Sequence, residues 1–406
     1  MKRSWPKHLL GEVADLCLGK MLDKNKNKGE LHPYLGNIHV RWGSFDLEEL
    51  PQMRFENHEH ERYGLRHGDL VVCEGGEPGR CALWKGQVPN MKIQKALHRV
   101  RPHACLDSRY LLYWFLEAGQ RKVFDQFCTG ATIKHLPGEK LAIIEVEVPP
   151  PPVQQRIAGI LSAYDELIEN SQRRIKILEQ MARNLYREWF VSFRFPGHAK
   201  TPMVDSPLGK IPKGWEYREL NQHGFIGRGK SRHRPRNAEL LYGGPYPFFQ
   251  TGDIKAARVF LHNHSQTYSE AGLAQSKLWD AGTLCITIAA NIAETAILAK
   301  EACFPDSVVG FIADPAKSDA FYVKMYLDTV KSQMQNVSRG TTQDNLSLEK
   351  LLGFHVLTPP LSVMEAFKVK VKPMLASLDT LLQAEENLRK TRDLLLPRLL
   401  SGQITI

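Results

Sequence analysis

The chain has 406 residues, of which 43% are hydrophobic and 24% are charged, a composition typical of chains that fold around hydrophobic cores. It excludes intrinsic disorder and a collagen-like chain, and at roughly 100–200 residues per domain the length predicts more than one domain. Lys and Arg (54) outnumber Asp and Glu (44), and the resulting net charge of +10 favours a polyanionic partner without identifying one.

The sequence carries no signal of a membrane or exported protein. Its longest uncharged, mainly apolar run, residues 281–293, is far shorter than the ~20 residues that span a bilayer. Lys2 and Arg3 are not followed by the apolar stretch of a signal peptide. The seven cysteines form no CxxC pair, so neither a disulfide framework nor a zinc ribbon is indicated. We therefore expect a cytoplasmic protein with reduced thiols.

Two kinds of sequence alternate along the chain. Residues 1–148 contain short β-rich runs separated by Gly, Pro and Asn, and one helical stretch near 107–120, which predicts an α+β domain. After a double proline, residues 149–198 change to helix-forming sequence. The same order follows again, with an α+β domain over 205–358 and helix-forming sequence over 359–406. Each long helix would extend roughly 60 Å at 1.5 Å per residue.

The second half of the chain repeats the first half at an offset of 210 residues. TGATIKHLPGEKL at 129–141 recurs as RGTTQDNLSLEKL at 339–351, and Pro149-Pro150 recurs as Pro359-Pro360. The Gly19-Lys20 pair recurs as Gly229-Lys230. In the middle of each α+β domain the offset becomes 214, so the two copies differ there by a short insertion. This pattern predicts a pseudo-two-fold internal repeat.

Both long helices carry an apolar stripe in alternating steps of four and three residues, which is the seam of a coiled coil. The predicted seam residues are Ile157, Leu161, Tyr164, Ile168, Ser171, Ile175, Leu178, Ala182, Leu185 and Trp189 in the first helix, and Phe367, Val371, Met374, Leu378, Leu381, Leu388, Leu395 and Leu399 in the second.

Two polar residues, Glu385 and Arg392, interrupt the second stripe. An antiparallel pair with Ile157 opposite Leu399 places Glu385 opposite Ser171 and Arg392 opposite Tyr164, the two seam residues of the first helix that carry hydroxyls. We therefore predict an antiparallel coiled coil within the chain. The alternatives are two amphipathic helices that each pack on their own domain, and a parallel coil between two chains. Pro373 predicts a kink or a restart of the second helix.

A basic run is the first candidate for DNA contact. Basic residues occupy every second position of 228–236, namely Arg228, Lys230, Arg232, Arg234 and Arg236. In an extended segment this period places all five on one side, where they could face successive phosphates. The equivalent place in the first half holds Lys20, Lys24, Lys26 and Lys28. The alternative is a solvated loop in each half.

The Gly-x-Thr loop before the last strand of each α+β domain is the second candidate. Its polar residues are of the types that hydrogen bond to phosphates and base edges. They are Thr129, Thr132, Lys134 and His135 in the first loop, and Arg339, Thr341, Thr342, Gln343 and Asn345 in the second. The alternative is a plain turn fixed by the glycine.

Motifs for catalysis are absent or incomplete. Residues 224–231 match the Walker A pattern, but no apolar strand precedes them and Pro235 stands where the following helix should run. His58-Glu59-His60 and His262-Asn263-His264 lack the spacing and the further ligands of a zinc site. No Asn-Pro-Pro-aromatic motif for methyl transfer is found. We predict no catalytic residue, no metal site and no cofactor in this chain.

The order of α+β domain, double proline and heptad helix, repeated once, resembles the specificity subunit of type I restriction-modification systems, the HsdS family. The resemblance covers essentially the whole chain. It rests on PPPPVQQRIAGILSAYDELIENSQRRIKILEQMARNLYREWF from Pro149, GDLVVCEGGEPGRCAL from Gly68, NMKIQKALHRVRP from Asn90 and the two Gly-x-Thr loops. Gln154-Gln155 replaces the acidic-Gln pair typical of the family, which puts details of partner docking in doubt, as does Pro373.

The resemblance implies two target recognition domains, each reading one half of a bipartite site in double-stranded DNA, joined by the helical spacer. It implies two methyltransferase subunits docked on the spacer and restriction subunits that join them. Catalysis, S-adenosylmethionine, ATP and Mg²⁺ would then belong to these partners. A type IIB-like specificity subunit is a sister alternative. A stand-alone nuclease or NTPase, based on the Walker-like loop, and a structural coiled-coil linker are alternatives of other classes.

Overall fold

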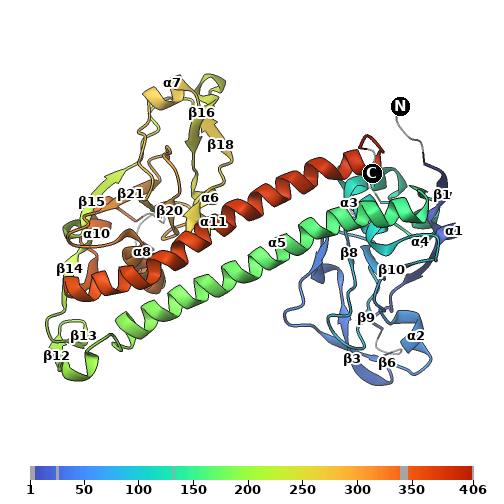
Figure 1. Cartoon of the computed structure of the whole chain (residues 1–406), viewed down its shortest axis with the longest axis horizontal. Coiled ribbons are helices and arrows are strands. Elements are labelled where there is room, and N and C mark those ends of the chain that lie inside the picture. Colours follow the sequence, from blue (N-terminus) through green and yellow to red (C-terminus); the bar gives the residue numbers. More distant parts are fainter. Residues whose placement is uncertain (1–4, 24–26, 131, 133, 339–345, 405–406) are drawn as a thin grey trace. The chain divides into compact units, whose positions relative to one another are not determined.

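The computed structural model describes residues 5–23, 27–130, 132, 134–338 and 346–404, and the chain divides into two compact units. Unit 1 contains residues 1–169 and 386–406, and unit 2 contains residues 170–385. Each unit combines an α+β domain with part of helix α5 (Pro151–Tyr186) and part of helix α11 (Leu361–Leu400) (Figure 1). Within the described residues, no helix is both long enough and apolar enough to cross a membrane.

The α+β domain of unit 1 is built on an antiparallel sheet with the strand order β2-β10-β7-β8. The strands of this domain are β1 (Lys7–Leu9), β2 (Ala14–Leu18), β3 (Glu30–Leu35), β4 (Val40–Arg41), β5 (Ser44–Phe45), β6 (Gln52–Phe55), β7 (Leu70–Cys73), β8 (Cys81–Leu83), β9 (Lys92–Ile93), β10 (Leu97–Pro102) and β11 (Glu145–Glu147). Its helices are α1 (Leu10–Val13), α2 (Glu59–Tyr63), α3 (Ser108–Gln120) and α4 (Gly138–Ala142). Strands β6, β3 and β9 form a second sheet.

Helix α3 covers the main sheet of unit 1. Asp107 caps its start by accepting hydrogen bonds from the backbone N–H groups of Arg109 and Tyr110, both at 2.9 Å. Leu111 and Phe115 on its inner face are fully buried and share one hydrophobic cluster with strands β7 and β10. The helix therefore fixes the sheet against the start of α5, whose Ile157 and Leu161 belong to the same cluster.

The α+β domain of unit 2 has a five-stranded sheet with the order β15-β21-β19-β20-β17. The strands of this domain are β12 (Met203–Ser206), β13 (Gly209–Pro212), β14 (Glu216–Glu219), β15 (Gly224–Arg228), β16 (Tyr242–Phe248), β17 (Phe260–Leu261), β18 (Gln266–Tyr268), β19 (Leu284–Thr287), β20 (Thr295–Leu298), β21 (Val308–Ala313) and β22 (His355–Thr358). Its helices are α6 (Thr251–Ala256), α7 (Glu270–Ala274), α8 (Ala320–Thr329), α9 (Lys331–Ser338) and α10 (Leu348–Leu352).

The two domains repeat one topology. The order β2-β10-β7-β8 in unit 1 corresponds to β15-β21-β19-β20 in unit 2, and the edge pair β1-β11 corresponds to β14-β22. Asp319 caps α8 as Asp107 caps α3. Tyr110 of α3 donates to the carbonyl of Glu147, and Tyr322 of α8 donates to that of Leu357. The predicted α+β class and internal repeat are confirmed.

Helices α5 and α11 pack antiparallel in each unit. In unit 1, Ile157 and Leu161 near the start of α5 share a cluster with Leu399 near the end of α11. In unit 2, the Trp189 ring, in the π-helical turn Arg187–Val191 that follows α5, lies 6.0 Å from the ring of Phe367 near the start of α11. This pairing within one chain confirms the antiparallel coiled coil and replaces the alternative of a parallel coil between chains. Every predicted seam residue is buried or half-buried.

The polar interruptions of the seam bond to neighbours of the residues named from the sequence. Arg392 donates to Oδ1 of Asp165 at 2.7 Å, one position beyond Tyr164. Gln172, one position beyond Ser171, donates from Nε2 to Glu385 Oε1 at 2.9 Å. The antiparallel register is therefore the expected one, but long side chains beside the seam reach the polar residues.

The expected restart of the second helix at Pro373 is wrong, because α11 continues through this residue. Proline lacks an N–H group and so leaves the carbonyl of Val369 without its helical donor. Pro373 and Val369 are both exposed, so water can satisfy that carbonyl without a break in the helix.

Candidate nucleic-acid interface

The basic segment, residues 228–236, leaves the end of strand β15 in unit 2. Its five basic residues, Arg228, Lys230, Arg232, Arg234 and Arg236, are all exposed, whereas Gly229 and Ser231 between them are buried. The alternation expected from the sequence is therefore present in the fold. Contact of these residues with DNA stays a prediction.

The backbone of the basic segment is fixed on the domain. Lys230 N donates to the carbonyl of Phe304 at 3.1 Å, and the backbone N–H groups of Arg232 and His233 donate to Gln275 Oε1 at 2.5 and 3.0 Å. A Cβ atom at Gly229 would lie 2.4 Å from the Phe304 carbonyl oxygen, so only glycine permits this approach. The basic side chains consequently project from a positioned backbone.

Three of the five cations have no acidic partner among the described residues: Arg228, Lys230 and Arg232. Arg236 forms an ion pair with Asp306 at 2.9 Å. Arg234 donates to the backbone carbonyls of Ser231 and His233, both at 2.8 Å. The basic segment thus divides into three available cations and two that the protein already engages.

Lys277 adjoins the basic segment, although the sequence analysis did not single it out. Its ammonium lies 3.6 Å from the centre of the Trp279 ring and 4.9 Å from that of Phe225, which is 55% exposed. Burial lowers the pKa of Lys277, and the nearby Lys230 lowers it further. The closeness of two cations and an exposed ring is typical of surfaces that bind nucleic acids. A basic residue two positions before a tryptophan was the available signal.

The first-half counterpart of this surface differs, and the prediction that Lys20 contacts DNA is wrong for this fold. Lys20 is 3% exposed, and its ammonium forms an ion pair with Glu59 and donates to the carbonyl of Arg54 at 3.0 Å. Gly19 recurs for a structural reason, because a Cβ there would lie 2.4 Å from the Gln94 carbonyl oxygen. The recurring Gly-Lys pair therefore marks a close backbone approach.

The remaining first-half candidates are partly described. Lys28 is exposed, whereas Lys24 and Lys26 lie outside the described residues. In the first Gly-x-Thr loop, Thr129, Thr132, Lys134 and His135 are all exposed.

The first Gly-x-Thr loop is closed by backbone hydrogen bonds in both directions between Thr129 and His135, each at 2.8 Å. Lys134 pairs with Asp125 at 3.0 Å. Gly130 has φ +92°, so the glycine does fix a turn, and the exposed polar residues lie on that turn. The second-loop candidates, Arg339, Thr341, Thr342, Gln343 and Asn345, lie outside the described residues.

The Walker-like pattern does not form a phosphate-binding loop. Gly224–Arg228 is strand β15, paired antiparallel with β21, whereas a P-loop leaves a strand and enters a helix. This geometry removes the observation on which an NTPase interpretation rests.

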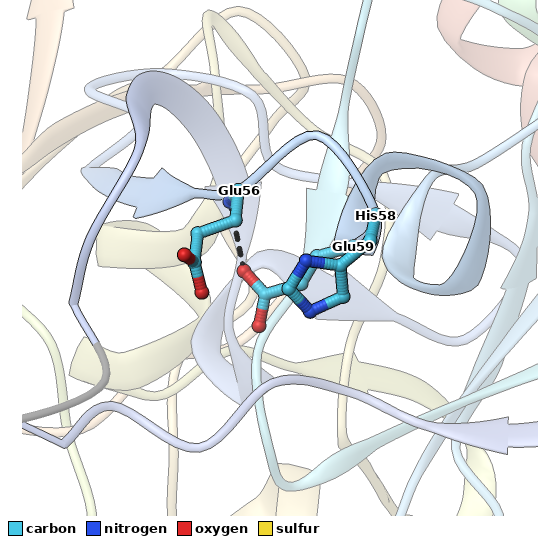
Figure 2. Close-up of side chains that lie close together, drawn as sticks. All are labelled: Glu56, His58 and Glu59. Atoms are coloured by element: carbon cyan, nitrogen blue, oxygen red, sulfur yellow. Dashed lines mark hydrogen bonds between the residues drawn. The ribbon is translucent and has the colours of Figure 1, made fainter.

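One group of possible metal ligands occurs among the described residues, consisting of Glu56, His58 and Glu59 (Figure 2). Glu59 Oε2 already accepts hydrogen bonds from Glu56 N, at 2.9 Å, and from Lys20. Burial opposes ionisation of Glu59, but the bonds from Lys20 and the Glu56 backbone outweigh it and lower its pKa. Because Lys20 neutralises this carboxylate, the group is explained as an ion-pair cluster.

Comparison with known sequences identifies the repeated architecture. The sequence model of the type I restriction modification DNA specificity domain matches residues 3–180 and again residues 212–388. The chain belongs to the type I restriction-modification specificity subunit family. Each match of this specificity domain covers most of one α+β domain and part of the helix that follows it, as the resemblance in the sequence implied.

Relatives of this family extend along nearly the whole chain. The MjaIX specificity subunit of Methanocaldococcus jannaschii is 24% identical over 84% of this chain and 78% of its own length. The HindI specificity subunit of Haemophilus influenzae is 25% identical over 98% of this chain and 99% of its own length. The crystal structure of the S subunit from M. genitalium shares the fold, with a TM-score of 0.66 at 15% identity over 98% of this chain and 96% of that one.

Proposed function

We propose that this specificity subunit reads a bipartite site in double-stranded DNA, with each α+β domain contacting one half-site. The observation that carries the proposal is the occurrence of the DNA specificity domain twice, once with each copy of the repeated fold. Two copies of one DNA specificity domain are suited to a site with two halves.

In unit 2 the proposed contacts come from Arg228, Lys230 and Arg232, which are exposed and have no acidic partner among the described residues. Cations of this kind release counterions when they meet phosphates and position a protein on the duplex without selecting the sequence. Base selection then depends on side chains aimed into a groove. In unit 1 the exposed residues Lys28, Thr129, Thr132 and His135 take this place.

The subunit further acts as a scaffold in this proposal. The antiparallel helices α5 and α11 form the spacer on which two methyltransferase subunits dock, and restriction subunits join that complex. Methyl transfer and cleavage, with S-adenosylmethionine, ATP and Mg²⁺, belong to those partners, and this chain is non-catalytic.

Methylation mapping in cells tests the proposal. The chain is expressed with the methyltransferase subunit of its own system in a host that lacks other methyltransferases, and every modified base is located by sequencing. We expect methylation within one motif of two defined half-sites separated by a fixed number of undefined bases. A continuous motif, or the same methylation by the methyltransferase subunit alone, would refute the proposal.

A further inference from the structure

A cavity of about 660 Å³ lies within unit 2, between the long helices and the α+β domain. Helices α5, α6, α8 and α11 contribute to its lining, together with residues 257–259 and 294–295. Its apolar lining includes Leu178, Ala182, Met325, Met374, Leu375 and Leu378. This volume is in the range of about 300–1,000 Å³ at which pockets hold ligands or inserted side chains.

In unit 1, three side chains pack together where helices α3, α5 and α11 meet. Tyr113 of α3 donates its hydroxyl to Asp165 Oδ2 of α5 at 2.5 Å, and Arg392 of α11 donates to Asp165 Oδ1 at 2.7 Å. All three are buried or half-buried. We call these residues the polar plug.

The internal repeat assigns an equivalent in unit 2 to each residue of the polar plug. The long helices correspond at 210 residues, and α3 corresponds to α8 at 212, the separation of their capping residues Asp107 and Asp319. The equivalents of Tyr113, Asp165 and Arg392 are therefore Met325, Leu375 and Ala182. All three line the cavity. The cavity thus occupies the position in unit 2 that the polar plug occupies in unit 1.

The rim of the cavity is cationic. Arg183 and Arg187 are exposed, lie one helical turn apart and have no described ion pair. Three other basic residues of the lining already pair with acids: Arg258 with Glu179 at 3.4 Å, Lys331 with Glu294 at 2.7 Å and Lys324 with Asp328 at 2.7 Å. The equivalents of Arg183 and Arg187 in unit 1 are Asp393 and Pro397, so unit 1 has no cation at these two positions.

These features define the chemistry of an occupant. Its apolar side chains would cover the lining, and its carboxylates would pair with the guanidinium groups of two residues that lie about 6 Å apart along the helix axis. An amphipathic helix with Asp or Glu residues four positions apart supplies both. DNA fits less well, because the backbone of a duplex is polar and charged throughout and would leave the apolar lining uncovered.

We infer that this cavity is a docking site for one acidic amphipathic helix of a methyltransferase subunit, and that the polar plug removes the equivalent site from unit 1. The inference rests on the proposed function, which supplies the partner. It adds that the two methyltransferase subunits bind this chain non-equivalently, one of them through the cavity of unit 2.

Charge reversal at the rim tests the inference in the assembled complex. Wild-type chain and its methyltransferase subunit are mixed, and the assemblies are counted by native mass spectrometry. We expect Arg183→Glu/Arg187→Glu to weaken the binding of one of the two methyltransferase subunits by at least about tenfold and to leave the other bound. The matched control is Arg173→Glu/Arg174→Glu, which reverses two exposed arginines on the same helix outside the cavity lining.

A second variant fills the cavity with the polar plug itself, as Ala182→Arg/Met325→Tyr/Leu375→Asp, and should lose the same single subunit. Unchanged assembly of the rim variant, equal loss in the control, or loss of both methyltransferase subunits would overturn the docking site while the DNA role stands. A wild-type chain that assembles with no methyltransferase subunit would instead overturn the proposed function.

Photo-cross-linking identifies the occupant directly. p-Benzoylphenylalanine placed at Val191, an exposed residue of the cavity lining, leaves both rim arginines in place, and in the assembly bound to a duplex it should cross-link to one acidic helical segment of the methyltransferase subunit. Cross-links to DNA in its place would show that the rim cations contact phosphates and would refute the protein occupant.

Discussion

The three unpaired cations of the basic segment should account for a defined part of the salt dependence of DNA binding. Each phosphate contact contributes a slope of about −0.9 to log affinity plotted against log salt concentration. Replacing Arg228, Lys230 and Arg232 by Ala should therefore make the slope less steep by about 2.7. When the salt concentration rises from 50 to 200 mM, the affinity of the triple variant should therefore fall by a factor about 40 times smaller than that of the wild type.

The assay is fluorescence anisotropy of the assembled complex on a labelled duplex that carries the methylated motif, titrated across that range of salt. The matched control is Arg234→Ala/Arg236→Ala in the same segment. Arg236 already pairs with Asp306, and Arg234 with backbone carbonyls, so this control should change the slope by less than about 1. An unchanged slope in the triple variant, or equal changes in both variants, would remove the basic segment from the DNA interface.

Three further predictions concern the internal contacts of the two units. Asp165 and Arg392 form a half-buried ion pair at 2.7 Å, which should show a coupling energy of about 1–2 kcal/mol in a double-mutant cycle of Asp165→Leu and Arg392→Met. The stability of unit 1 is measured by hydrogen exchange, and additive losses of stability in the double variant would contradict a direct contact. Gln154→Leu should destabilise unit 1 by about 2–4 kcal/mol, because the buried Gln154 amide bonds to Asp107 N, Cys105 O and Pro149 O. The control Gln155→Leu changes the exposed face of the helix and should cost about 0.5 kcal/mol or less, and equal losses of stability in hydrogen exchange would refute the role of Gln154. Burial, together with Arg218 and Lys317, lowers the pKa of His223 from 6.5 to about 4, so the unfolded chain binds the proton more tightly than the folded one. The contribution of His223 to the stability of unit 2 should therefore be full above pH 6.5 and be lost as the pH decreases toward 4. Thermal unfolding of His223→Gln should lack this pH dependence, and a pH dependence identical to that of the wild type would show that His223 does not cause it.

The long helices could be predicted because their determinants are local and repeated. A double proline starts each one, and the steps of four and three fix which face is buried, so Ile157 and Phe367 could be placed without knowing the fold. The partner of Arg392 was predicted less accurately. Seam geometry identifies the residue opposite Arg392 on the other helix, but it does not show whether a neighbouring side chain can reach Arg392. Asp165 rather than Tyr164 is the acceptor.

The candidate DNA residues show that a pattern of charges in the sequence does not predict which of these charges are exposed. Lys20 and Lys230 occupy equivalent positions after a glycine that the backbone requires, yet Lys20 is buried against Glu59, 39 positions away, and Lys230 is exposed. A charge run does not reveal whether the fold brings an acid to one of its members. The cavity of unit 2 was missed for a related reason, since its lining joins residues of five separate segments of the chain. Comparing Asp165 with Leu375 across the repeat was the available signal.

The measurement that tests the central claim most directly is methylation mapping of a chimera. Residues 1–148 are replaced by the matching domain of a relative with a different motif, and the chimera is expressed with the methyltransferase subunit. Because each α+β domain reads its own half-site in this account, one half of the methylated motif should change to that of the relative. The other half and the spacer length should stay as in the wild type. A coordinated change of both halves, or an unchanged motif, would contradict the account.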